Sequence, residues 1–261
     1  MWRFPRRLAL ALAAALAAMV VAVACGFAGE GTGALGTGPS SDAMTSGVIA
    51  ADGSSTSGGA DAGVDAAACT PVPLDALNSA SWALLGSATI SGTSVRLTPL
   101  DMGSSSGALW WKTPISFTGR LHVVLDFTFA LGSTQGDGIT VAWIPTSKPY
   151  TLGPQGQSYG ICNAMLQGSA VAVDTRDNQF VVVSPISDCD TTGVVTVSSL
   201  LTAKKVTVDI TAAAIKASLD TGITIQRNVS SPTTGYLGFT AATGGGFTSH
   251  SVMSVSASLC P

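Results

Sequence analysis

The chain is poor in charged residues, and glutamate is almost missing from it. Only 10% of the 261 residues are charged, the formal net charge is −3, and Glu30 is the single glutamate. A weakly acidic chain lacks the basic face that nucleic acid requires, so we expect no nucleic-acid partner. Glycoside hydrolases need a pair of carboxylates, and here no predicted strand carries Asp at alternating positions. We therefore expect a protein that is not an enzyme.

A long apolar run stands at the N-terminus. Residues 1–24 join Arg3, Arg6 and Arg7 to the stretch LALALAAALAAMVVAVA, a pattern typical of an export signal. The run ends in AVAC, which resembles the bacterial lipobox, although Ala22 stands where that motif usually has Leu. We expect Cys25 to be lipidated and to anchor the exported protein at the outer membrane or cell surface. An ordinary signal peptide with a chance Cys is the alternative.

The segment 25–68 is predicted to be a linker. It is rich in Gly, Ser, Ala and Thr, and Phe27 is its single aromatic residue. Such a segment cannot bury enough apolar surface to offset the entropy lost on ordering. The folded domain is then 69–261.

Four cysteines lie in the predicted domain: Cys69, Cys162, Cys189 and Cys260. An even number in an exported chain predicts two disulfides, and the count alone leaves three pairings open. No C-x-x-C or His-rich spacing points to zinc.

Short runs with alternating apolar and polar residues recur through the domain and predict strands. Examples are RLHVVLDFTFAL (120–131), GITVAWI (138–144), KVTVDI (205–210) and AIKASLD (214–220). Asp220-Thr-Gly222 predicts a tight hairpin after the last of these. Because no amphipathic helix is evident, the pattern favours an all-β sandwich or barrel.

Four stretches, in order, resemble motifs of the L-type (legume-lectin-like) lectins. They are GDGITVAWI (136–144), GQSYGICN (156–163), VAVDTRDN (171–178) and GYLGFTAATGGGFTSHSVMSVSASL (235–259). The resemblance implies a concanavalin A-like jelly roll of two antiparallel sheets, with a carbohydrate site in loops at one end. Fold likeness does not by itself establish function, so the site is considered residue by residue.

The resemblance assigns sugar-binding roles to particular positions. Asp137 corresponds to the family's Asp that accepts hydrogen bonds from sugar hydroxyls, and charge-assisted bonds suit that task. Gly156 corresponds to the glycine whose N–H reaches the sugar, and Asn178 to the Asn that contacts sugar and calcium. The closing loop comprises Gly244, Gly245 and Phe247, whose ring could face a pyranose; Tyr159 is a weaker candidate.

The family's metal site is incomplete in this sequence. Ala172 stands where the family has a metal-binding Glu, and the QFVVVS stretch offers neither the later Asp nor the His. Calcium prefers six to eight oxygens, and Asp174 and Asn178, with Asp177, supply only part of that set. We expect a hydrogen-bonded turn, with calcium held weakly if at all.

In the family, bound calcium also helps to hold a cis peptide before the sugar-binding Asp. The resemblance leaves two alternatives here. Either the peptide before Asp137 is trans and the site is reshaped, or packing and a disulfide hold it cis without a metal, and this second case would keep weak sugar binding.

The resemblance also implies a disulfide pairing, because the family's first and last strands are neighbours. Cys69 would then pair with Cys260, and Cys162 with Cys189 near the site. The predicted function is carbohydrate binding by a lipid-anchored protein, with a glycan or glycoprotein as partner. The alternative is a structural or adhesion protein that keeps the fold without binding sugar; a glycoside hydrolase is less favoured.

Several other side chains invite a functional interpretation but are predicted to be structural. His250 and His122 are both expected to serve the fold. Trp110 and Trp111 should point to opposite faces of a strand, so one of them could be a surface platform while the other joins the core.

Overall fold

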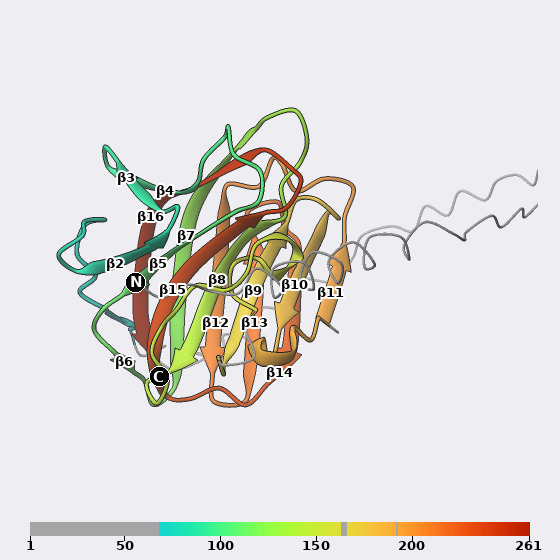
Figure 1. The fold of residues 1–261 in the computed structure, drawn as a ribbon. Coiled ribbons are helices and arrows are strands. Elements are labelled where there is room, and N and C mark those ends of the chain that lie inside the picture. The colour runs from blue at the N-terminus through green and yellow to red at the C-terminus, as the bar shows by residue number, and fades with distance from the viewer. Residues whose placement is uncertain (1–67, 163–165, 192) are drawn as a thin grey trace, which may run out of the picture. The chain divides into compact units, whose positions relative to one another are not determined.

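Two antiparallel β-sheets packed face to face make up the domain (Figure 1). The structure, a computed structural model, describes residues 68–162, 166–191 and 193–261. Cys25, the predicted signal and the predicted linker up to residue 67 lie outside these residues. No helix in the described ranges is long and apolar enough to cross a membrane. The all-β sandwich prediction is confirmed.

The strands and two short 3-10 turns follow one another along the chain. They are β1 (Thr70–Pro71), β2 (Trp82–Gly86), β3 (Thr89–Ser91), β4 (Ser94–Thr98), β5 (Ser105–Trp111), β6 (Ile115–Ser116), β7 (Arg120–Leu131), β8 (Gly138–Pro145), η1 (Gly156–Ser158), β9 (Ser169–Asp174), β10 (Gln179–Val183), η2 (Ile186–Asp188), β11 (Gly193–Thr196), β12 (Lys205–Thr211), β13 (Ala214–Leu219), β14 (Thr224–Asn228), β15 (Thr234–Thr243) and β16 (Thr248–Cys260).

The strands divide between two sheets of eight. The back sheet has the order β14-β13-β12-β7-β16-β4-β3, with β1 added beside β16. The front sheet has the order β11-β10-β9-β8-β15-β5-β2, with β6 added beside β15. Neighbours in these orders are often far apart in the chain, as expected of a jelly roll, so loops from distant segments meet at the ends of the strands.

The back sheet is amphipathic, and its strands show it in their sequence. Along β7, Leu121, Val123, Leu125 and Phe127 are buried, while the residues between them are partly exposed. Side chains alternate between the faces of a strand, so this pattern puts one apolar row against the front sheet and a polar row in solvent.

The central strands of the front sheet are buried on both faces, which explains why β8 and β9 are apolar almost throughout. Its outer face is covered by side chains from the segments around η1 and η2, including Tyr159, Ile161 and Ile186. Trp110 packs under this cover and Trp111 in the core between the sheets, with only 0% and 6% of their surfaces exposed. The favoured prediction, that each of them lies in the core, is confirmed, and neither is a surface platform.

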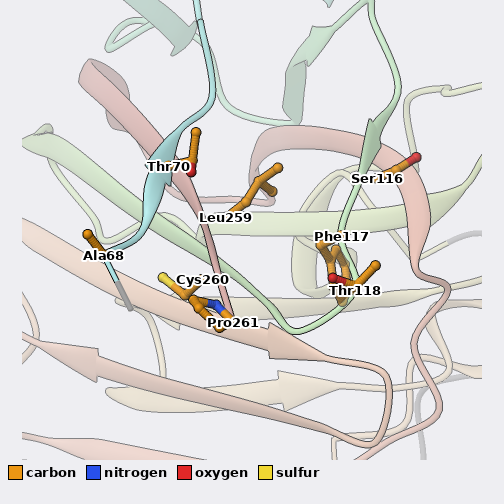
Figure 2. Close-up of a pocket in the computed structure, with 8 residues that line it drawn as sticks. All are labelled: Ala68, Thr70, Ser116, Phe117, Thr118, Leu259, Cys260 and Pro261. Carbon is orange, nitrogen blue, oxygen red and sulfur yellow. The ribbon is translucent and has the colours of Figure 1, made fainter. Parts of the chain in front are cut away.

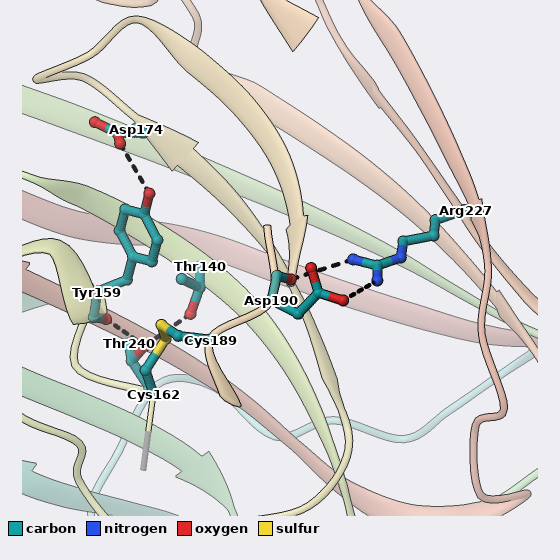
Figure 3. Close-up of a disulfide and its surroundings, with 8 residues drawn as sticks. All are labelled: Thr140, Tyr159, Cys162, Asp174, Cys189, Asp190, Arg227 and Thr240. Carbon is teal, nitrogen blue, oxygen red and sulfur yellow. Dashed lines mark hydrogen bonds and ion pairs between the residues drawn. A yellow bond between two sulfur atoms is a disulfide. The ribbon is translucent and has the colours of Figure 1, made fainter. Parts of the chain in front are cut away.

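Both implied disulfides form. Cys69 pairs with Cys260 beside the β1–β16 contact, and Cys162 pairs with Cys189 between the η1 and η2 segments (Figure 3). The first bridge closes a separation of 191 residues and the second one of 27 residues. In the chain-entropy model, loops of these sizes contribute about 5 and 3–4 kcal/mol respectively to the free energy of unfolding.

Candidate functional site

A polar cavity of about 270 Å³ opens at the end of the sandwich where β8 begins. It collects residues from three separate segments: the one before β8, the turn after β9 and the loop between β15 and β16. The lining residues are Thr134, Gln135, Asp137, Arg176, Gly245 and Gly246.

Asp137 is the buried charge of this cavity, with 2% of its surface exposed. Its Oδ1 lies 3.2 Å from Nη1 of Arg176, whose side chain is half exposed. Its Oδ2 is buried and has no hydrogen-bond partner. Buried polar atoms in native proteins are almost always partnered, so an unpartnered carboxylate oxygen on a residue that lines a cavity is an acceptor that a ligand donor could satisfy.

The backbone around Asp137 is held by hydrogen bonds on both sides. The Thr175 N–H donates to the Asp137 carbonyl at 3.1 Å, and the Thr175 hydroxyl donates to the Gly136 carbonyl at 2.8 Å. The Gly136 N–H in turn donates to Oγ1 of Thr248 at 2.6 Å. These bonds fix the carboxylate without using either of its oxygens.

Gly138 shows why glycine follows the aspartate. It has φ +150°, and a Cβ there would lie 2.3 Å from the Val173 carbonyl oxygen. The peptide before Asp137 is trans, since the cis peptide within the described residues is Ser184–Pro185. Of the two alternatives left open by the sequence, the first is therefore found.

Glycines leave space around the carboxylate. A Cβ added to Gly244 would lie 3.2 Å from Oδ2 of Asp137 and 3.5 Å from Cα of Gly156. A Cβ on Gly245 would meet nothing within 4 Å. The structure thus brings together four residues that the sequence nominated from distant segments: Asp137, Gly156, Gly244 and Gly245.

Four nominated residues lie outside the cavity lining; Gly156 and Gly244 lie close to Asp137, whereas Phe247 and Asn178 have other contacts. Phe247 packs its ring near Gly103, where an added Cβ would be 3.6 Å from Cζ. Asn178 has φ +53°, and its Oδ1 accepts the Leu200 N–H at 3.3 Å. Neither side chain faces Asp137 in this arrangement.

The carboxylate of Asp174 accepts hydrogen bonds that stabilise the turn following β9, and this is its role in place of binding an ion. Its Oδ1 accepts the N–H groups of Arg176 and Asp177 at 2.9 and 3.0 Å, and its Oδ2 accepts the Tyr159 hydroxyl at 2.8 Å (Figure 3). Burial raises the pKa of Asp174, and these hydrogen bonds oppose the rise. Burial, reinforced by the nearby Asp174, raises the pKa of Tyr159, so the phenol keeps its proton and donates it.

These residues do not fit a calcium ion. The oxygens of Asp174 and the Oδ1 of Asn178 already accept hydrogen bonds, and Ala172 has no side-chain oxygen to offer. Across the described parts of the chain, no group of three or more His, Cys, Asp or Glu side chains could hold a metal. The DTRDN stretch is a hydrogen-bonded turn.

Arg176 is the site residue that the sequence analysis missed. Arg176 lies in the turn between Asp174 and Asn178, where the sequence alone indicates an ordinary solvent-exposed charge. The hydrogen bond from its guanidinium to Asp137 raises the pKa of Arg176. With one N–H engaged by Asp137, the guanidinium keeps other donors for a ligand.

A larger cavity, of about 460 Å³, lies at the opposite end of the strands beside the Cys69–Cys260 bridge (Figure 2). Its lining includes Thr70, Phe117 and Leu259 and no charged side chain. It therefore lacks the charge-assisted acceptor found at Asp137, which makes the smaller cavity the better candidate.

Comparison with known proteins agrees with the β-sandwich fold described above. Residues 69–189 match the model of the legume-like lectin family. No curated protein matches the sequence.

Solved lectins share the fold. The Ca²⁺-bound VIP36 exoplasmic/lumenal domain is 20% identical over 69% of this chain and 84% of its own, with a TM-score of 0.55. The Lotus tetragonolobus seed lectin is 17% identical over 70% and 95%, with a TM-score of 0.59. The Bauhinia forficata lectin in complex with GalNAc is 16% identical over 70% and 93%, with a TM-score of 0.58. At such identities the likeness establishes the legume-lectin jelly roll and nothing finer.

Proposed function

We propose that this domain binds neutral saccharides in the cavity at Asp137. The observation that carries the proposal is the buried Oδ2 of Asp137, which lacks a partner and belongs to a residue that lines a cavity bordered by glycines. A sugar hydroxyl supplies the missing donor. Among proteins of this fold, VIP36 has been solved with Man3GlcNAc and the Bauhinia lectin with GalNAc, which supports a saccharide as the ligand class.

The binding mode follows from the unused groups. A sugar hydroxyl donates to Oδ2 of Asp137, and Arg176 donates from its free N–H groups to a neighbouring sugar oxygen. Gly245 and Gly246 let the ring approach the backbone. With few contacts and an open mouth, we expect a dissociation constant on the order of millimolar, about −4 kcal/mol.

Binding should depend little on divalent metal. The hydrogen bonds that fix Asp137 come from Thr175 and Thr248, and the turn after β9 is closed by Asp174. Protein groups therefore do the positioning that an ion could otherwise do, and a chelator should leave the site intact.

Export and lipid anchoring at Cys25 complete the proposal. The described chain begins beside Cys260, at one end of β16, while Thr248 at the other end of β16 contacts the Asp137 segment. β16 has 13 residues, or ~40 Å at about 3.3 Å per residue. A tether entering at Cys69 would thus leave the saccharide site at the far end of the domain, open to the surroundings.

One observation favours a second candidate, a structural or adhesion protein that has lost sugar binding. Asp174 and Asn178, which contact calcium or sugar in the family, are engaged within the protein here. An enzyme is less favoured, because both buried aspartates at the site are tied to neighbours and the single glutamate is Glu30.

A glycan array probed with the purified domain tests the proposal. We expect binding to a subset of neutral glycans, equal in calcium and in chelator. No binding to any glycan would support the structural candidate. Binding that disappears in chelator would show that a metal site forms despite the engaged ligands.

A further inference from the structure

Tyr159 is buried, and it connects three segments that are far apart in the chain. Only 4% of its surface is exposed, and it ends the η1 turn that begins with Gly156. Its hydroxyl donates to Oδ2 of Asp174, in the turn after β9, at 2.8 Å (Figure 3). Its carbonyl accepts the hydroxyl of Thr240, on β15, at 2.7 Å. Tyr159 thus links η1, the turn after β9 and β15.

The backbone of Tyr159 lies in the left-handed region, with φ +53°. This conformation is uncommon for an aromatic residue and persists only where the surroundings enforce it. The Tyr159 N–H donates to the Gly156 carbonyl at 3.0 Å, and the Cys162–Cys189 disulfide joins the η1 segment to the η2 segment. Residues held in this way cluster at binding sites, so the backbone of Tyr159 also points to a functional role.

Asp174 is a buried carboxylate that has no cation beside it. It is 2% exposed, and no ion pair engages it in the described parts of the chain. Its Oδ1 accepts the N–H groups of Arg176 and Asp177, whereas its Oδ2 accepts only the Tyr159 hydroxyl. Burying a carboxylate oxygen without a donor or a cation is costly. Without the phenol hydroxyl, the turn after β9 would therefore have to shift.

The same turn holds Asp137 in place. The Thr175 N–H donates to the Asp137 carbonyl, and Nη1 of Arg176 contacts Oδ1 of Asp137. Asp174, Thr175 and Arg176 are consecutive, so a shift of Asp174 moves the two residues that fix Asp137. The hydroxyl of Tyr159 thus acts on the saccharide acceptor through this turn.

We propose that Tyr159 is the positioning residue of the saccharide site. Its hydroxyl is the neutral partner of Asp174, in place of a cation, and it sets the turn that carries Arg176. The phenol packs in the same apolar cluster as Ala172, which stands on the same face of β9 as Asp174. It therefore occupies the side of the strand from which residue 172 would have to reach a metal. The inference rests on the proposed function of the cavity at Asp137.

Tyr159→Phe removes the hydroxyl and keeps the ring in the apolar cluster. The probes are mannotriose and N-acetylgalactosamine, titrated into the purified protein by calorimetry. We expect the affinity for the probe that the wild type binds to fall about tenfold, in calcium and in chelator alike, because the turn carrying Arg176 is no longer fixed.

Tyr150→Phe is the matched control. Tyr150 packs against the same apolar cluster and stacks on Trp110 with ring centroids 6.0 Å apart. Its hydroxyl has no hydrogen bond in the described parts of the chain, so its removal should leave the affinity unchanged.

A second measurement needs no ligand. In NMR spectra of the free protein, the guanidinium signals of Arg176 report its contact with Asp137, and they are assigned by their loss in Arg176→Ala. They should move toward the positions of solvent-exposed arginines in Tyr159→Phe and stay in place in Tyr150→Phe. A residue that only stabilised the fold would leave these signals unchanged in the folded protein.

A double variant separates stability from positioning, because Tyr159→Phe leaves a buried charge without a donor. Tyr159→Phe/Asp174→Asn removes that charge and keeps an oxygen for the N–H groups of Arg176 and Asp177. It should melt at a higher temperature than Tyr159→Phe, while the affinity stays low and the Arg176 signals stay displaced. If Tyr159→Phe does not fold, the double variant decides in the same way.

The outcomes separate this inference from the proposed function. Affinity in Tyr159→Phe equal to that of the wild type, or Arg176 signals that do not move, would overturn the positioning role. Affinity regained in the double variant would also overturn it, because the hydroxyl would then act through stability alone. A wild type that binds no glycan would overturn the proposed function, and displaced Arg176 signals would then still support the role of Tyr159 in fixing the turn.

Discussion

Asp137 and Arg176 illustrate how a buried charge can be positioned for a ligand rather than for stability. Arg176 is half exposed and contacts one oxygen of the buried Asp137, so the ion pair compensates the buried charge only in part. The other oxygen is left buried without a donor. Proteins tolerate such a group where it serves binding, at some cost in stability.

Replacing Arg176 with Ala should weaken saccharide binding about ten- to a hundredfold, the effect of losing a charged hydrogen bond to the ligand. The melting temperature should fall as well, because the buried carboxylate of Asp137 would lose its charged partner. Lys204→Ala, an exposed cation outside both cavities, serves as the control. Unchanged affinity in Arg176→Ala would remove the arginine from the proposed binding mode.

His250 is a structural histidine, and its burial makes stability depend on pH. The Thr98 hydroxyl donates to the Thr248 carbonyl, so Nδ1 of His250 donates to Thr98 and Nε2 is a bare, buried acceptor. Burial lowers the pKa of His250 from 6.5 to about 3. Between these values the unfolded chain binds a proton that the folded domain does not, so stability falls as the pH is lowered.

The expected loss from His250 is on the order of a few kcal/mol between pH 6.5 and pH 3, with no contribution above that window. His250→Asn, which can keep the bond to Thr98, should flatten this dependence. Asp174 acts with the opposite sign because its pKa is raised, so variant and wild type are compared at each pH by chemical denaturation. Parallel pH profiles for the two proteins would contradict the assignment.

The sequence identified Asp137 and the glycines around it because a motif carries them. It could not reveal Arg176, since nothing in a turn sequence shows which way a charged side chain folds back. The role of Asn178 stays a prediction; in the structure its Oδ1 accepts the Leu200 N–H. The sequence shows which residue types stand at the site. Their hydrogen-bond partners come from segments far away in the chain, which the sequence does not place.

The loop between β15 and β16 forms one wall of the first cavity. Its glycines differ in how much space a side chain would have. A Cβ on Gly246 would lie 1.9 Å from the Gln135 carbonyl oxygen, whereas Gly245 has open space around it. Substitutions at Gly246 and Gly245 can therefore test the packing of this loop and its role in binding separately.

Gly245→Leu should keep the melting temperature near that of the wild type and abolish binding, because the side chain would extend into the cavity. Gly246→Ala should lower the melting temperature and binding together, because the loop must move away from Gln135. Thermal unfolding and glycan titration of both variants test this. A Gly245→Leu variant that still binds would place the ligand elsewhere.

Among the strands, those of the back sheet were the easiest to predict. The run 120–131 matches β7, and the hairpin at Asp220–Gly222 joins β13 to β14, with Gly222 at φ +85°. Trp110 in the front sheet was harder, because its cover comes from segments around η1 and η2 that have no periodic pattern. Alternation of apolar and polar residues along a strand indicates that one face of the sheet is buried. It cannot show which segments cover the other face.

The whole protein is proposed to be a domain tethered to a membrane through Cys25. Cys25→Ser should release the protein from membranes into the soluble fraction, since the acyl chains would be lost. Mass spectrometry of the mature N-terminus checks the modification directly, and Cys69→Ser, which removes a cysteine of the domain, should leave the protein in the membrane fraction. An unmodified N-terminus cleaved elsewhere would rule out the anchor.

The central claim is that the unpartnered carboxylate oxygen of Asp137 binds the saccharide. The most direct measurement titrates immobilised neutral glycans with wild type, Asp137→Ala and the control Asp126→Ala, which alters a carboxylate on the back sheet. We predict that Asp137→Ala abolishes binding in calcium and in chelator alike while its melting temperature stays level or rises, because a buried unsatisfied group is removed. Binding that persists in folded Asp137→Ala would contradict the account.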